Sequence, residues 1–320
     1  MTDDLDAKPD SAAESEDDEA PARGATVARF FVLPLLVVGT ALVIFFVFNL
    51  MTFERRSPAD ELAEVRGGTA NRRWQAAFEL SRTIGHMPAG PERDALSAET
   101  RRVFEGLSGK RSDDVKVSSY LVLVLGKLQD RAALPQLLAA ARDEDPETRL
   151  YAIWGLGMIG DRGAVDTVIE SSSSQVAGAR KMAAYVLGKL GEPRAGSRLR
   201  VLLGDPVADV RWNAAIALAL LHDGSGIEVL RGMTDRGALG RQAALSSEQT
   251  ETAMVSALQA LAVLRDPGSL ALIDRVARED PNLRVREAAR RAADATRGSA
   301  SAPAAKSSGI LERPAGVLVV

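Results

Sequence analysis

A constant spacing of 31 residues recurs through the middle of this chain and constrains its fold more than any other feature. A small residue stands near the end of each apolar segment, and these residues are Gly126, Gly157, Gly188 and Ala219. Two further ladders keep the same interval; they are Asp130, Asp161, Glu192 and Asp223, and Arg149, Arg180 and Arg211. Three ladders with one period indicate internal repeats, in which each unit packs mainly against its neighbours.

Each repeat is predicted to be a pair of helices joined by a turn. The expected first helices are Tyr151–Ile159, Met182–Leu190 and Asn213–Leu221, and the expected second helices are Ala164–Glu170, Arg194–Leu203 and Ile227–Met233. Small residues let one helix approach the next closely, and leucines on the same face fill the space between layers. Because one hairpin cannot bury its own apolar face, the pattern predicts an all-α fold, an α-solenoid of stacked helical hairpins.

Two segments carry a family resemblance. DPETRLYAIWGLGMIGD, from Asp145, and DPVADVRWNAAIALALLHD, from Asp205, resemble HEAT repeats of the short bacterial kind, which are related to the HEAT-like repeats of phycobilisome lyases. The resemblance implies a solenoid over residues 70–297, with an enlarged connection that holds a helix near 94–107. A break in the period places about 12 extra residues near 234–247, and the charged last unit is expected to cap the array.

An uncharged, mostly apolar run extends from Phe30 to Phe53, between Arg29 and Glu54. As a helix it would be roughly 36 Å long, enough to cross a hydrocarbon core of about 30 Å. A cleavable signal peptide would have a shorter apolar core, and a buried core helix of this length would usually show a polar face. The run therefore predicts one N-terminal transmembrane helix, 30–53, that stays uncleaved.

The arginines that flank this run predict its orientation. Arg23 and Arg29 precede it, whereas five arginines follow it, namely Arg55, Arg56, Arg66, Arg72 and Arg73. Because positive charge accumulates on the cytoplasmic side of a span, the count favours repeats in the cytoplasm. The expected localisation is a membrane, as a single-pass protein of a bacterial inner membrane, with the lipid bilayer itself as one partner.

The remaining segments complete the predicted organisation. Residues 1–29 form an acidic tail that is expected to be disordered, because residues 1–22 hold nine carboxylates against one lysine. Residues 54–69 are predicted as a juxtamembrane linker. Residues 298–320 are predicted as a flexible tail whose apolar end, from Gly309, either folds back or docks on a partner. The near-neutral body after the apolar run argues against binding to nucleic acid, which requires clustered basic residues.

The inventory of reactive residues predicts no enzyme. The chain has no cysteine and two histidines, His86 and His222, and His222 takes the turn position of Gly160 and Gly191. Deoxyhypusine hydroxylase, a HEAT-repeat enzyme that this architecture resembles, holds iron with repeated His-Glu pairs, and no such pair occurs here. We therefore expect no catalytic residue, no metal site and no cofactor.

The predicted function is a membrane-anchored scaffold for protein-protein interaction. We expect the shorter helices to supply the binding surface, and the candidate residues are Gln136, Arg198, Arg231 and Asp274. The alternative is an assembly factor or lyase-like accessory of an enzyme that holds a cofactor or a client protein.

Two other residue sets allow two interpretations each. The arginines at the helix starts are Arg149, Arg180, Arg211 and Arg286. Pairing with acidic residues of adjacent units is favoured for them, and binding of anions or acidic peptides is the alternative. The tryptophans are Trp74, Trp154 and Trp212. Their apolar positions favour core packing over exposed binding anchors.

Overall fold

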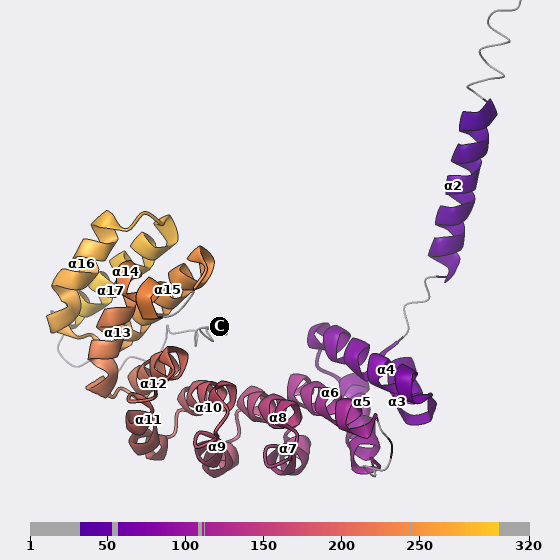
Figure 1. Cartoon of the computed structure of the whole chain (residues 1–320), viewed down its shortest axis with the longest axis horizontal. Helices are drawn as coiled ribbons and strands as arrows, with labels where there is room; N and C mark the ends of the chain where they lie inside the picture. The colour runs from indigo at the N-terminus through magenta and orange to yellow at the C-terminus, as the bar shows by residue number, and fades with distance from the viewer. Residues whose placement is uncertain (1–32, 53–56, 108–110, 112, 243–244, 301–320) are drawn as a thin grey trace, which may run out of the picture. The chain divides into compact units, whose positions relative to one another are not determined.

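A computed structural model describes residues 33–52, 57–107, 111, 113–242 and 245–300 (Figure 1). The chain divides into two units, Met1–Arg56 and Ser57–Val320. Across the described ranges, helices are the regular elements, which confirms the predicted all-α class. The predictions for the acidic tail 1–29 and for the apolar end after Gly309 lie outside the described residues.

The first unit contains one described helix, α2, which extends from Leu33 to Thr52. Its side chains are described from residue 34 to residue 48, and the large apolar ones among them are exposed. In the part of the chain that the structure describes, no helix combines the length and the apolar character that crossing a membrane requires. The described residues therefore do not support the predicted span, Phe30–Phe53.

The second unit begins with helix α3, Pro58–Gly67, where the sequence predicted a linker over 54–69. Ser57 and Asp60 form a capping box that satisfies backbone N–H groups at the helix start. Leu62 and Val65 are buried against the following helix. Capping and burial together explain why this segment belongs to the folded unit.

A buried ionic cluster joins the first helices of this unit, which are α4 (Ala70–Thr83), η2 (Ile84–His86), α5 (Pro91–Glu105) and α6 (Asp114–Leu128). Nη1 of Arg73, on α4, donates to Asp113 at 2.7 Å and to Asp114 at 3.0 Å. Its Nε donates to the Val65 carbonyl on α3 at 2.7 Å. The three charged side chains are almost fully buried, so this cluster fixes α3, α4 and α6 to one another.

The predicted helical hairpins follow. They consist of η3 (Arg131–Ala133), α7 (Leu134–Ala140), α8 (Pro146–Ile159), η4 (Arg162–Ala164), α9 (Val165–Ser171), α10 (Ala177–Leu190), η5 (Pro193–Ala195), α11 (Gly196–Leu202), α12 (Ala208–Leu220), η6 (Gly224–Gly226) and α13 (Ile227–Met233). The long first helices α6, α8, α10 and α12 form one row, and the short helices α7, α9 and α11 form a second row beside it (Figure 1). The helical-repeat solenoid is thus confirmed.

The small-residue ladder marks where successive first helices touch. A Cβ added to Gly188 would lie 2.7 Å from the Cβ of Ala217 and 2.8 Å from its Cα. Gly126 meets Gly155 in the same way, and Gly157 meets Val186. Each contacted residue stands two positions before the next member of the ladder. The same helix-to-helix contact therefore recurs once in every unit of 31 residues.

The turn after each first helix also repeats. One residue per turn has a positive φ, and these residues are Gln129 (53°), Gly160 (69°), Gly191 (67°) and His222 (57°). The next residue is acidic, and at Asp130, Asp161 and Asp223 the carboxylate accepts a hydrogen bond from the backbone N–H two residues later. Three members of the acidic ladder thus close the turn that starts a short helix, whereas the side chain of Glu192 makes no such hydrogen bond.

The last part of the unit departs from the 31-residue period. It contains α14 (Arg236–Gln242), α15 (Ser247–Leu264), η7 (Pro267–Ser269), α16 (Leu270–Glu279) and α17 (Leu283–Ala300). The extra residues predicted near 234–247 include α14. Helix α17 passes residue 297, the predicted end of the solenoid, and it packs against α15 and α16.

Substitution of Gly188 tests the contact between first helices. We expect Gly188→Val to destabilise the protein by about 1 to 3 kcal/mol, because the new side chain must push α10 away from α12. Thermal unfolding of the full-length protein, followed by circular dichroism, measures the change.

His222→Gly is the matched control, because it changes a repeat position that lies in an exposed turn. Relief of the left-handed backbone at His222 offsets the greater flexibility of glycine in the unfolded chain. We therefore expect unchanged stability or a gain of up to about 1 kcal/mol. Equal melting temperatures for the two variants would contradict the assigned register.

Candidate protein-binding surface

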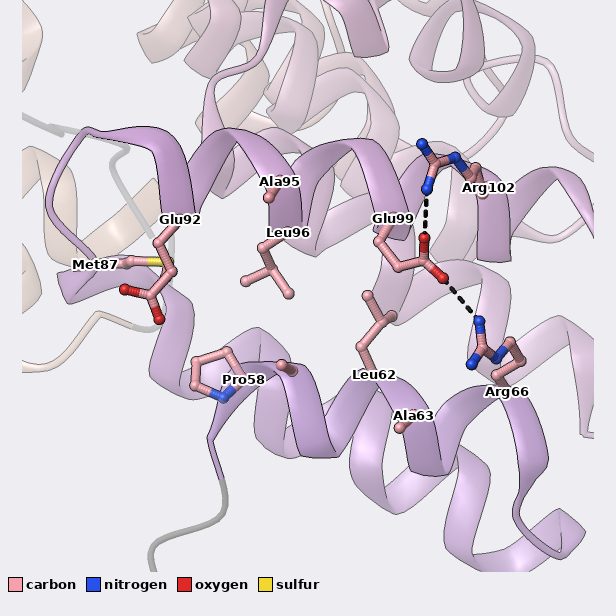
Figure 2. Close-up of a pocket in the computed structure, with 11 residues that line it drawn as sticks. Pro58, Leu62, Ala63, Arg66, Met87, Glu92, Ala95, Leu96, Glu99 and Arg102 are labelled. Atoms are coloured by element: carbon pink, nitrogen blue, oxygen red, sulfur yellow. Dashed lines mark hydrogen bonds and ion pairs between the residues drawn. The ribbon is translucent and has the colours of Figure 1, made fainter.

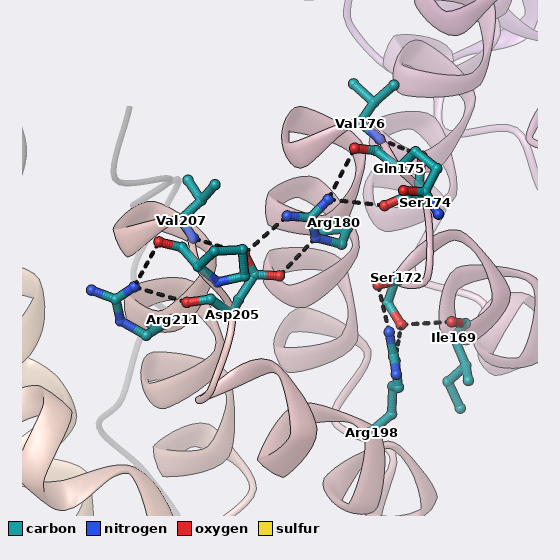
Figure 3. A network of polar contacts seen from close by, with 11 residues as sticks. Ile169, Ser172, Ser174, Gln175, Val176, Arg180, Arg198, Asp205, Val207 and Arg211 are labelled. Atoms are coloured by element: carbon teal, nitrogen blue, oxygen red, sulfur yellow. Dashed lines mark hydrogen bonds and ion pairs between the residues drawn. The ribbon is translucent and has the colours of Figure 1, made fainter.

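Two of the candidate residues, on the short helices α7 and α11, contact neighbouring repeats. Gln136 on α7 donates from Nε2 to the Glu105 carboxylate at 2.6 Å. Arg198 on α11 donates to the Ser172 hydroxyl at 2.7 Å and to the Ser172 carbonyl at 2.8 Å (Figure 3). Both side chains are half-buried. Each therefore joins its own repeat to the preceding one.

The other two candidate residues are engaged in the same manner. Arg231 on α13 donates from Nη2 to Asp266 at 2.8 Å and from Nε to the Ser269 hydroxyl at 2.9 Å. Asp274 on α16 accepts two hydrogen bonds of 2.6 Å from Arg297 on α17. All four predicted residues thus lie on short helices and take part in contacts within the fold, and the structure does not bring them together in one cluster.

The arginine ladder has a shared structural role that involves the backbone (Figure 3). Nη1 of Arg180 donates to the carbonyls of Ser174 at 2.9 Å and Gln175 at 3.2 Å. The same pair of contacts, to the carbonyls six and five residues earlier, is made by Arg149, Arg211 and Arg286. Each arginine therefore holds the connection that leads into its own helix.

Arg180 also makes the contact with an adjacent unit that the sequence predicted. Its Nε and Nη2 donate to the two carboxylate oxygens of Asp205 at 2.7 and 2.9 Å. These hydrogen bonds from Arg180 hold the pKa of Asp205 below its ordinary value, and they raise the pKa of Arg180. Pairing with an acidic neighbour is thus present, in addition to the carbonyl contacts that all four ladder arginines share.

A groove of about 410 Å³ lies between α3 and α5 (Figure 2). Leu62 and Leu96 form its apolar floor. At one end Glu99 accepts hydrogen bonds from Arg66 at 2.9 Å and from Arg102 at 2.7 Å. Because one carboxylate bridges two guanidinium groups, this end of the groove keeps one positive charge in excess.

The outer side of the first helices carries a row of aromatic side chains, which we call the aromatic face. It consists of Trp74 and Phe78 on α4, Tyr120 on α6, Tyr151 and Trp154 on α8, and Tyr185 on α10. The rings of Phe78 and Tyr120 meet edge to face, with centroids 5.3 Å apart, and those of Tyr120 and Tyr151 stack at 6.4 Å. These contacts show that the row is continuous across α4, α6 and α8.

The aromatic face leaves part of each ring accessible. Phe78 is 37% exposed, and the other five side chains are half-buried. Trp212, in contrast, is 2% exposed and packs in the core, as predicted for all three tryptophans. Trp74 and Trp154 also pack against the core, as predicted, but they are half-buried and keep part of each ring accessible. Trp154 is three residues after Tyr151 and so shares its face.

Lysines accompany the aromatic face. Within the described ranges the lysines are Lys116 and Lys127 on α6 and Lys181 and Lys189 on α10. Lys116 lies 5.3 Å from the centroid of the Trp74 ring, a cation–π contact. Lys189 contacts the sulfur of Met158, on α8, at 3.5 Å. The ammonium groups of Lys116 and Lys189 therefore border the same surface.

Burial changes the acidity of the tyrosines on this face. Desolvation, then the hydrogen bond from the Tyr151 hydroxyl to Glu147 at 2.8 Å, raises the pKa of Tyr151 to about 12. Desolvation also raises the pKa of Tyr120 and Tyr185. The phenols are thus held in the neutral form; the single proton of Tyr151 is donated to Glu147.

Comparison with known proteins supports the repeat assignment. A model of HEAT repeats matches residues 103–178 and 171–249, so this part of the chain consists of HEAT repeats. No curated protein matches the chain.

Several solved structures are similar to the chain, including the following two. One is an engineered protein, with 17% sequence identity and a TM-score of 0.43, over 76% of this chain and 97% of that one. The other is human deoxyhypusine hydroxylase in complex with glycerol, with 18% identity and a TM-score of 0.30, over 75% of this chain and 96% of that one.

Alkaline titration of the tyrosine hydroxyls probes the aromatic face directly, because the chain has three tyrosines and all three lie on this face. We expect tyrosinate absorbance at 295 nm to rise above pH 10 in the folded protein and near pH 10 in urea. A folded pKa above the unfolded value of 10.0 means that the phenol of Tyr151 stabilises the fold below pH 10. This contribution is lost as the pH rises towards 12.

The variant Tyr151→Phe is the control for this titration. It should lose less stability than the wild type between pH 10 and 12. Coincident titration curves for folded and unfolded protein would contradict the proposed environment of the three rings.

Proposed function

We propose that this protein is a non-enzymatic scaffold that binds a protein partner on the aromatic face. The observation that carries the proposal is the gathering of aromatic residues: after residue 57 the chain has eight, and six of them lie on this face. Aromatic side chains with accessible apolar area are enriched at the centres of protein interfaces, where they supply much of the binding energy. The repeats hold this row on rigid helices, which lowers the entropy cost of binding.

This proposal moves the binding surface from the short helices to the first helices. The four residues predicted on the short helices hold neighbouring elements together, so a partner would have to break those contacts to use them. The aromatic rings also contact one another, and Lys116 covers the Trp74 ring, but each ring keeps an accessible part that a partner can reach.

Photo-crosslinking tests the choice of surface. A photoreactive phenylalanine analogue replaces Tyr120 in one full-length variant and Val201 in another; Val201 is 62% exposed on α11, in the row of short helices. We expect irradiation in cells to join the Tyr120 position to one defined protein and to leave the Val201 position unreacted. Crosslinking from the Val201 position alone would show that the partner binds on the short helices.

We also propose that the uncharged run Phe30–Phe53 anchors the chain in a membrane, with the repeats on the cytoplasmic side. The described side chains of α2 span about 22 Å of helix, less than a bilayer core, so the proposal rests on the sequence of the longer run. The exposed apolar side chains of α2 agree with a lipid environment. The orientation is supported by the greater number of arginines after the run.

A reporter that is active only in the cytoplasm, fused after Val320, tests anchoring and orientation together. We expect reporter activity in the membrane pellet after alkaline washing. Deletion of residues 30–53 should move the activity to the supernatant, and it serves as the control. Full-length fusion protein in the supernatant would contradict the anchor, and a silent reporter in the pellet would reverse the orientation.

A further inference from the structure

The aromatic face lies between two edges that are set by the parallel packing of the first helices. Near the helix starts, Lys116 on α6 covers Trp74 on α4. Near the helix ends, Lys127 on α6 donates to the Ser81 carbonyl on α4 at 2.5 Å. Helices α4 and α6 therefore run in one direction, and the glycine contacts near the ends of α6, α8, α10 and α12 extend this direction along the row. The aromatic row crosses these helices between the edge formed by their starts, the starting edge, and the edge formed by their ends, the ending edge.

The ending edge carries positive charge at a repeated position. The equivalent residues, 31 apart, are Lys127, Met158, Lys189 and Leu220, and this set contains two lysines and no carboxylate. At the starting edge the charges are mixed, because Lys181 lies 3.7 Å from Asp209 and Glu147 accepts from Tyr151. The outward position at the ending edge is therefore basic, and the acidic ladder begins three residues further on, in the turns that lead to the short helices.

The spacing between the edges suits one helix. Eleven residues separate Lys116 from Lys127, and eight separate Lys181 from Lys189, so the lysines stand about 16 Å and about 12 Å apart along their helices. An α-helix with its side chains is about 10–12 Å wide. A partner helix that lies along the row, between the two edges, would place its apolar side on the rings and its two flanks beside the lysines.

These observations point to the chemistry of the partner, in an inference that rests on the proposed function of the aromatic face. We propose that the partner docks an acidic amphipathic helix across the aromatic face, with carboxylates beside Lys127 and Lys189. Desolvation lowers the pKa of Lys127, and a carboxylate near its ammonium group would raise that pKa.

Two other occupants fit less well. A second copy of this chain would bring lysines against lysines, which costs electrostatic energy. The acidic segment 1–22 of the chain itself has the required charge, but its large apolar residues are limited to Met1 and Leu5. Such a segment cannot cover a row of six aromatic rings.

Selection from a random peptide library displayed on phage, against the immobilised full-length protein, tests the charge of the occupant. We expect the enriched peptides to combine net negative charge with apolar residues at helical spacing. A synthetic copy of the strongest peptide should bind at least tenfold more weakly to Lys127→Glu/Lys189→Glu. The control pair Arg131→Glu/Arg278→Glu changes exposed arginines away from the aromatic face and should leave the affinity within twofold.

A variant of the aromatic row separates failure of this inference from failure of the proposed function. Neutral or basic peptides whose binding is lost in Trp154→Ala would overturn the acidic helix but keep the surface. Peptides insensitive to Trp154→Ala and to Tyr120→Ala, both checked for folding by circular dichroism, would overturn both, and so would a selection without enrichment.

Brominated phospholipids in nanodiscs test whether a lipid bilayer, rather than a peptide helix, covers the aromatic face. Trp74 and Trp154 lie on the aromatic face, whereas Trp212 is buried. We expect their fluorescence to persist when brominated phosphatidylglycerol replaces the normal lipid around the full-length protein. Strong quenching would show that this face lies against the bilayer, and it would overturn the peptide proposal.

Discussion

The close approach of successive first helices is the constraint on which the rest of the repeat unit depends. At Gly126 and Gly188 the backbone of one helix meets the next helix with no room for a side chain. Small residues are therefore required at one point in each repeat, and the interval between those points fixes the register of the helices. Everything on the outer side of the helices inherits this register, which brings Tyr120 beside Tyr151, 31 residues later.

The connections between repeats depend on a second interaction, that of arginine with backbone carbonyls. A connection that is partly buried needs partners for its carbonyl groups, and each ladder arginine supplies two N–H donations to them. The position of the arginine was visible in the sequence as part of the ladder. Its acceptors were not, because a carbonyl belongs to every residue alike, so sequence reasoning turned to acidic side chains instead.

The same distinction separates what could be predicted from what could not. The hairpins and their period were predictable, because close packing demands particular residue types at fixed positions. Helix α3 was missed although Ser57 and Asp60 carry a capping signature, since ten residues beside an apolar run resemble a linker. The aromatic face was missed because Tyr185 and Trp154 keep the 31-residue interval with each other but are offset by three from the Tyr120–Tyr151 pair. Three residues is nearly one helical turn, so both pairs reach the same face, and only the folded arrangement makes this evident.

The two basic residue types divide their tasks across the fold. The ladder arginines, such as Arg180, hold the connections between helices, and Arg73 belongs to a buried ionic cluster. Both roles suit the guanidinium group, which is planar and has five N–H donors in a fixed arrangement. The described lysines make fewer contacts each: Lys116 covers the Trp74 ring, and the half-buried Lys127 and Lys189 each donate to one atom of the preceding first helix. A lysine carries one compact ammonium on a flexible stem, so it can change its partner without breaking the packing beneath it. A surface that must accept an incoming carboxylate while its helices stay in register is better served by such a residue. The placement of lysine on the aromatic face therefore follows from the rigidity that the glycine contacts impose on the helices below.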